Sequence, residues 1–324
     1  FTTATDTYNV GVGYDAGALV TTGTFNTLIG GRSGDALTTG AQNTALGYSS
    51  LGSSTTASYN TALGREAGTS ITTGASNTVV GTDAGQAITT GAMNTIIGHD
   101  AGDAITDADY NVAMGYLALS ADTLGSQSVA IGTNALRNQN FTSATNAFNT
   151  AVGMSAGLAV TTGTQNTLIG SLAGDAITTG IQNVALGMGA FGAATDADYN
   201  VAIGAYALDA DTLGSTTVAV GYGALTTQNF TTATNTYNTA VGHLAGTAVT
   251  TGVSNTFIGG LAGDAFTDAD YNVAIGSQAL SLDTLGSRSV AIGHAVLQTQ
   301  NFTTATDAYN TAVGFSAGTT LTTG

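Results

Sequence analysis

Apolar and polar positions along the chain recur in one five-residue unit. It begins with Asn, Ser or Thr, continues through small or apolar residues and ends with an aliphatic residue and Gly, as in Asn26-Thr27-Leu28-Ile29-Gly30. The unit starts at residues 9, 26, 43, 60, 77, 94, 111, 128, 149, 166, 183, 200, 217, 238, 255, 272, 289 and 310, so that every step is 17 residues except three of 21. A fixed short period predicts a solenoid, in which each coil buries its apolar side by stacking on its neighbours. We therefore expect an all-β protein, a β-solenoid (β-roll) of about 18 stacked 17-residue coils.

Two neighbouring positions of the unit are apolar and lie on opposite sides of the expected strand. With the first residue of the unit as position zero, position three is aliphatic in all eighteen coils and position two is mostly Ala, with Leu28, Val79 and Phe257 among the exceptions. Because side chains alternate along a strand, one column faces the coil interior and the other needs a separate cover. We expect position three to face inward and position two to pack on sister chains of a homotrimer; the pattern also permits the exchanged assignment.

Other positions predict how the coils stack. Position zero is Asn in fifteen coils, and a column of Asn side chains can join coil to coil through amide hydrogen bonds. The side-chain sizes at positions eight and eleven vary inversely. When position eight is Gly, as at Gly34, position eleven is large and apolar, as at Leu37. When position eight is Leu or Phe, as at Leu119, position eleven is small or polar, as at Asp122. All eighteen coils obey this exchange, which predicts one large side-chain slot in a close-packed interior.

The three steps of 21 residues contain the same four-residue addition, Gln-Asn-Phe-Thr. The additions lie at 139–142, 228–231 and 300–303. Insertions in solenoids emerge as loops on one face, often the face that binds. The candidate binding residues are therefore Asn140, Phe141, Asn229, Phe230, Asn301 and Phe302. The Asn-Phe-Thr triplets also match the acceptor pattern for N-glycosylation.

Charge is sparse and one-sided. The 324 residues include 19 Asp, one Glu, four Arg and no Lys, which gives a net charge of −16. Such a surface repels phosphate groups, so we exclude nucleic acid as a partner. No run approaches the roughly 18 apolar residues that a membrane helix needs, so we expect no membrane insertion in this segment. The chain has no Cys, which excludes disulfides and thiolate metal ligands.

The candidate metal ligands are Asp-x-Asp pairs, whose oxygens suit calcium. These pairs are Asp107/Asp109, Asp196/Asp198 and Asp268/Asp270. They lack the Gly-rich spacing of calcium-stacked rolls, so polar turn residues are the favoured interpretation and calcium the weaker one.

The sequence shows no group of residues that could form a catalytic site. His99, His243 and His294 each follow a position-four Gly, and we expect exposed turn residues, because acid–base or metal chemistry needs convergent partners. No nucleophile, base and orienting group come together, so we expect no enzyme and no cofactor. Recurrent Thr-Thr-Gly triplets stack hydroxyls along one edge, which leaves an ice-binding solenoid as a third hypothesis.

The core segments Ser128–Gly132, Ser289–Gly293 and Asn238–Gly242 resemble the head repeats of trimeric autotransporter adhesins, and the full coil resembles the repeats of phage tail fibres. The resemblance implies a β-roll that trimerises and a place outside the cell, at the cell surface or on a virion. It covers almost the whole chain but carries over no functional residue. Because the chain begins at Phe1, a counterpart of the inserted Phe residues, and stops at Gly324 within a coil, we expect residues 1–324 to be a single repetitive segment of a longer fibre.

These expectations lead to a structural and adhesive function. The favoured hypothesis is the shaft of a cell-surface adhesin or phage tail fibre, a stiff homotrimeric spacer whose inserted loops are candidates for binding a host-surface glycan. The alternative is a self-assembling extracellular filament or surface appendage without a receptor.

Overall fold

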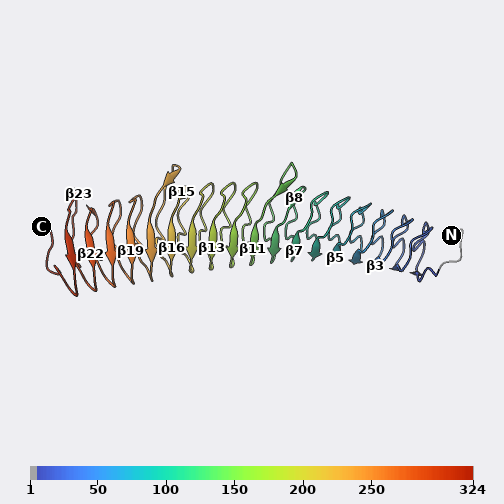
Figure 1. Ribbon diagram of the computed structural model, residues 1–324, viewed down its shortest axis with the longest axis horizontal. Coiled ribbons are helices and arrows are strands. Elements are labelled where there is room, and N and C mark those ends of the chain that lie inside the picture. Colours follow the sequence, from blue (N-terminus) through green and yellow to red (C-terminus); the bar gives the residue numbers. More distant parts are fainter. Residues whose placement is uncertain (1–5, 324) are drawn as a thin grey trace. The chain divides into compact units, whose positions relative to one another are not determined.

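A computed structural model of the chain describes residues 6–323, and within that range short strands alternate with turns and no helix occurs (Figure 1). The chain divides into two units, Phe1–Thr164 and Gln165–Gly324. Phe1 and Gly324, on which the expectation of a longer fibre depends, lie outside the described residues. Each described unit is a β-solenoid, which confirms the predicted all-β class and the coil of about 17 residues.

In the described part of the first unit, nine three-residue strands form one parallel ladder, one strand from each coil. They are β1 (Val10–Val12), β2 (Thr27–Ile29), β3 (Thr44–Leu46), β4 (Thr61–Leu63), β5 (Thr78–Val80), β6 (Thr95–Ile97), β7 (Val112–Met114), β9 (Val129–Ile131) and β11 (Thr150–Val152). Two shorter strands, β8 (Gly125–Ser126) and β10 (Thr145–Asn146), pair with each other in parallel.

The described part of the second unit repeats this arrangement. Its ladder contains β12 (Thr167–Ile169), β13 (Val184–Leu186), β14 (Val201–Ile203), β16 (Val218–Val220), β18 (Thr239–Val241), β19 (Thr256–Ile258), β20 (Val273–Ile275), β22 (Val290–Ile292) and β24 (Thr311–Val313). Two additional parallel pairs join β15 (Gly214–Ser215) with β17 (Thr234–Asn235) and β21 (Gly286–Ser287) with β23 (Thr306–Asp307). In both units, equivalent positions pair from coil to coil, as Ala202 pairs with Ala219.

The two apolar columns are assigned the opposite way to our preferred expectation. Position two faces the interior, where Ala45 and Ile96 are fully buried, whereas position three faces outward and leaves Leu46 45 % and Leu186 43 % exposed. The preferred assignment was therefore wrong, because two apolar columns on one strand look alike to a period-two pattern. The exchanged assignment, which the sequence also permitted, is correct.

The interior slot predicted from positions eight and eleven is present, and position two shares it. A Cβ on Gly68, at position eight, would lie 2.8 Å from Ile71 Cδ1, at position eleven. A Cβ on Gly174 would lie 2.7 Å from the position-two side chain of Leu168. Large side chains at positions two and eleven can therefore share a level of the core, as Phe257 and Phe266 do, but position eight must then be Gly.

The predicted Asn ladder is also confirmed. Asn43 donates its backbone N–H to Asn26 Oδ1 at 3.0 Å, and its side-chain amide donates to the Ala57 carbonyl at 2.9 Å. Both side chains are fully buried. Each amide thus joins two coils and closes its own coil, so that the buried polar groups are satisfied without water.

Candidate functional site

The loop formed by each insertion begins one or two residues later in the chain than the sequence indicates. Gln139 keeps the position-eleven place in the interior, and Asn140 stays in register with Thr123 of the preceding coil. The exposed residues of the loop are Thr142, Ser143 and Ala144, after which β10 pairs with β8. The extra length is therefore taken up after residue 140 rather than within 139–142.

The aromatic rings of the inserts pack inward instead of facing a ligand. Phe141 and Phe230 are each only 6 % exposed, and Phe302 is half-buried. Asn140 and Asn229 are exposed, but their Oδ1 atoms accept hydrogen bonds from Thr123 and Thr212 at 3.1 and 3.0 Å. Asn301 Oδ1 accepts a similar bond from Thr284. The predicted loop residues thus attach the insert to its coil, and the Phe141 and Phe230 rings offer no surface for stacking on a sugar.

A buried polar network fixes each insert, and sequence reasoning missed it. Asp211 Oδ1 accepts hydrogen bonds from the backbone N–H groups of Gly214 and Phe230 at 3.0 and 3.1 Å. Gln228 Nε2 donates to Asp211 Oδ2 at 2.5 Å and to Thr217 Oγ1 at 3.1 Å, and Gln228 Oε1 accepts from Asn238 Nδ2 at 2.8 Å. The same contacts recur around Asp122 with Gln139 and around Asp283 with Gln300.

This network replaces the Asn ladder where the ladder is interrupted. Ser128, Thr217 and Ser289 are the three non-Asn residues at position zero, and each shares a coil with the Gln of one network. The Gln amide supplies the acceptor that the missing Asn would have offered to the next coil. Burial raises the pKa of the Asp211 carboxyl above its ordinary 3.8, and the Gln228 donor opposes that rise. The joint change at positions zero and eleven is the sequence signal that would have found the network.

The Asp residues predicted as calcium ligands accept hydrogen bonds from the preceding coil. Asp109 Oδ1 accepts from the Ala92 N–H at 2.7 Å, and Asp107 accepts from the Thr90 hydroxyl. The other two pairs make the same contacts: Asp196 with Thr179, Asp198 with Ile181, Asp268 with Thr251 and Asp270 with Val253. Within residues 6–323, no third His, Asp or Glu joins any of these pairs in a metal-ligating group.

The His residues and the Thr triplets lie on the surface without converging. His99, His243 and His294 are exposed and contact aromatic neighbours, as His243 stacks on Tyr222 with ring centroids 5.6 Å apart. In the Thr-Thr-Gly triplets that begin at 21, 38, 72, 89, 178 and 250 the first hydroxyl donates to a carbonyl of the next coil, as Thr38 donates to Thr55 at 2.9 Å. Only the second Thr of each triplet is therefore a candidate for contact with an ice lattice.

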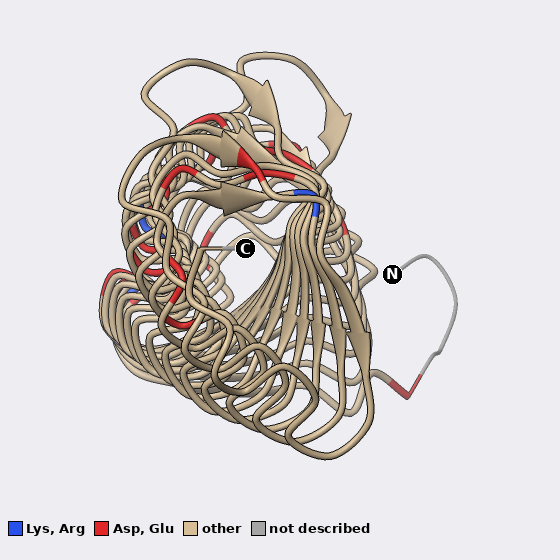
Figure 2. Ribbon diagram, turned by 90° about the vertical axis from the view of Figure 1, so that its left-hand side faces the viewer, with Lys and Arg blue, Asp and Glu red and all other residues tan. Residues whose placement is uncertain are grey.

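The outward face of the main ladder carries no acidic residue. All 20 Asp and Glu residues of the chain fall outside positions minus one to five of the coils, and eleven of the twelve Tyr residues fall at positions minus one and five. These Tyr residues are largely exposed, as Tyr59 is at 60 %. Figure 2 shows the stacked strands in tan, with the red acidic segments on other sides of the coils. We call positions minus one to five the strand face.

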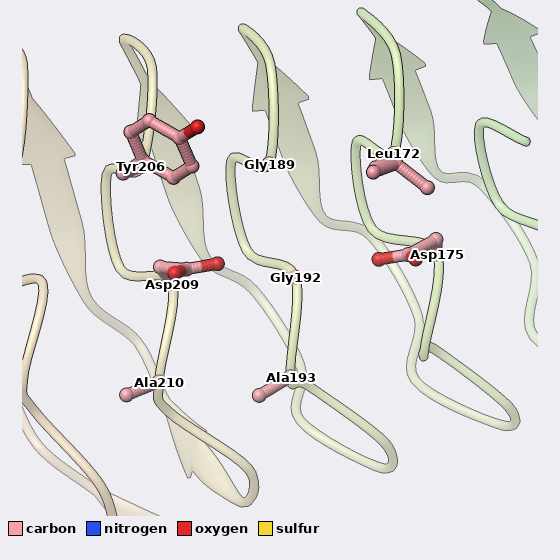
Figure 3. A pocket seen from close by; sticks show the side chains of 8 residues that line it. All are labelled: Leu172, Asp175, Gly189, Gly192, Ala193, Tyr206, Asp209 and Ala210. Atoms are coloured by element: carbon pink, nitrogen blue, oxygen red, sulfur yellow. The ribbon is translucent and has the colours of Figure 1, made fainter. Parts of the chain in front are cut away.

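A hollow of about 410 Å³ lies in the second unit, away from the strand face. The coil beginning at 183 has Gly at positions six and nine, where the coils on either side carry Leu172 and Tyr206, and Asp175 and Asp209. Figure 3 shows the two carboxylates pointing toward each other across Gly192. A Cβ on Gly192 would lie 2.6 Å from Asp209 Oδ1 and 3.7 Å from Asp175 Oδ1. The hollow is therefore the space that side chains at positions six and nine of this coil would otherwise fill.

The two carboxylates of the hollow have no cationic neighbour. Among the described residues, no Arg or His forms an ion pair with either one. Burial raises the pKa of both carboxyls, and the charge of Asp209 raises that of Asp175 further. Asp175 and Asp209 were not among the Asp pairs predicted from the sequence, because they lie two coils apart. The signal that was available is Asp, Gly and Asp at position nine of three successive coils.

No protein-family model matches the chain, and a search of curated proteins finds no match. Within the described residues, no helix is long and apolar enough to cross a membrane. Any function must therefore be argued from the geometry of the coils.

Proposed function

We propose that the chain is a structural shaft of an extracellular fibre, on a cell surface or a virion, in which three copies pack through their strand faces. The observation that carries the proposal is the segregation of charge. A chain of net charge −16 keeps every acidic residue off the strand face of each unit and lines that face with aliphatic side chains flanked by Tyr. Tyr enrichment and depletion of Asp and Glu characterise the cores of protein interfaces.

The size of the strand face fits such an interface. At about 4.8 Å per coil and about 3.3 Å per residue, positions zero to four of nine coils present roughly 700 Å² in each unit. The face of each unit is therefore close to the roughly 800 Å² per partner that a stable complex buries. A copy of the same chain also presents its side chains at the same coil spacing. The proposal keeps the homotrimer of the sequence analysis but places position three, rather than position two, against the sister chains.

Light scattering coupled to size exclusion tests the assembly. We expect a mass near three times 31.8 kDa for the wild-type chain. The double variant Leu186→Glu/Ile258→Glu adds two charges to the strand face, where these side chains are 43 % and 39 % exposed, and is expected to be monomeric because the charges would be buried between copies.

The matched control adds the same charges elsewhere. Leu19 and Leu282, both at position ten, are 58 % and 52 % exposed, and Leu19→Glu/Leu282→Glu should leave the mass unchanged. A monomeric wild type would rule out the trimer. A mass that grows with concentration would favour the filament. Thermal hysteresis of a monomer would favour ice binding by the second Thr of the Thr-Thr-Gly triplets, such as Thr22, Thr39 and Thr73.

A further inference from the structure

We propose that the hollow around Gly192 binds a primary ammonium group carried on a short apolar stem. The inference does not depend on the proposed assembly, because the hollow lies outside the strand face. It rests on the facing pair Asp175 and Asp209, on the seat that Gly192 leaves between them, and on an apolar wall beside that seat.

The seat has the geometry of a site for one compact donor. A Cβ on Gly192 would lie 2.6 Å from Asp209 Oδ1 and 3.7 Å from Asp175 Oδ1, so the two carboxylates border the space above Gly192 that no side chain fills. A donor in van der Waals contact with the Gly192 backbone lies between them and can reach both. An ammonium carries three N–H donors around a single atom, whereas a guanidinium is a flat fork suited to one carboxylate at a time. Placing a positive charge there also relieves the repulsion between the two carboxylates.

The wall of the hollow favours an organic cation over a hydrated metal ion. Tyr206 lies over Gly189, where a Cβ would be 3.1 Å from its ring, and Leu172, Ala193 and Ala210 complete the apolar lining. An aromatic ring beside the seat adds cation–π attraction, and the methyl groups can cover an alkyl stem. Tyr206 is also the one Tyr of the chain outside positions minus one and five.

A second copy of these 324 residues cannot supply a lysine ammonium to the seat, because they contain no Lys. A lysine side chain of a foreign protein and an amino sugar share the required chemistry. The probes should therefore include both a lysine analogue and glucosamine.

Methyl NMR titration of the full chain tests the proposal. Butylammonium and the side chain of N-acetyl-lysine methylamide are expected to shift the Leu172, Ala193 and Ala210 methyl resonances saturably at millimolar concentration, whereas butanol, with the same stem and no charge, should not. Glucosamine binding as tightly as the lysine analogue would point to a sugar source, and its failure would point to a protein source. Equal shifts with butanol, or binding of calcium in preference to butylammonium, would overturn the proposal.

Two variants locate the binding. Gly192→Ala places a Cβ in the seat and Asp209→Asn removes one charge, and each is expected to weaken butylammonium binding at least tenfold. Gly52→Ala and Asp264→Asn are the matched controls, because Gly52 is the position-nine Gly of the first unit and Asp264 has no Asp at position nine of either neighbouring coil. Unchanged affinity in both seat variants would refute the site, and Asp209→Asn keeps the test valid if Gly192→Ala disturbs the coil.

Discussion

Gly204→Ala is expected to open the second unit at the coils that begin at 200 and 217, with a loss of about 4 kcal/mol in local stability. Gly204 occupies position four with φ of +129°, in a region that disfavours residues with a Cβ. An added Cβ would lie 2.5 Å from the carbonyl oxygen and 2.6 Å from the carbonyl carbon of Gly221 in the next coil. Backbone cannot yield as a side chain can, so the two coils must separate and lose hydrogen bonds between them.

Hydrogen exchange measured along the second unit checks this prediction. The amides of Val201 and Gly221, which donate to the Thr217 and Ile203 carbonyls and so join these two coils, should lose protection in Gly204→Ala. Gly192→Ala in the same unit is the control, because its φ is not left-handed and its Cβ would approach a carboxylate side chain most closely. Its exchange should change by the equivalent of less than about 1 kcal/mol. Equal protection in the two variants would contradict the role assigned to position four.

The sequence predicted the coil, the Asn ladder and the interior slot because each repeats in phase. It could not assign positions two and three by alternation alone, since both columns are apolar. The deciding signal was a relation among three positions. Whenever position eight is Leu or Phe, as in Leu119, position two is Ala, and the large position-two residues such as Leu28 and Phe257 occur only with Gly at position eight. Residues that exchange volume share one core, which places position two inside.

The functional features were harder to predict because they arise between coils. The Asp175–Asp209 pair forms across an intervening Gly, and the network at each insert joins residues of three successive coils. The rings of Phe141 and Phe230 looked like exposed loop residues because a Phe in a surface insertion has no repeat to indicate its burial. Their burial depends on a backbone N–H bond to the Asp of the preceding coil, as Phe230 makes to Asp211.

Gln228→Leu is expected to lower the stability of its insert by about 3 kcal/mol at neutral pH. The change removes the donor to Asp211 Oδ2 and the acceptor of Asn238 Nδ2, and all three side chains are fully buried. A buried carboxylate left with fewer donors is costly because its charge is no longer solvated. Exchange of the Gly214 and Phe230 amides, which donate to Asp211, reports the loss directly. Gln182→Leu, on an exposed position-minus-one side chain, is the matched control and should change exchange little.

The pH dependence separates the loss of charge solvation from the loss of packing. Burial already raises the pKa of Asp211 in the folded chain above 3.8, so its contribution to stability is fullest in acid and falls as pH rises through the folded-state pKa. The Gln228 donor opposes that rise, so its removal raises the folded-state pKa of Asp211 further. The pH range over which the folded chain loses stability then becomes wider. The deficit of Gln228→Leu should therefore be smaller at about pH 3.5 than at about pH 7. A deficit that is the same at both pH values would assign the effect to packing and remove the carboxylate from the explanation.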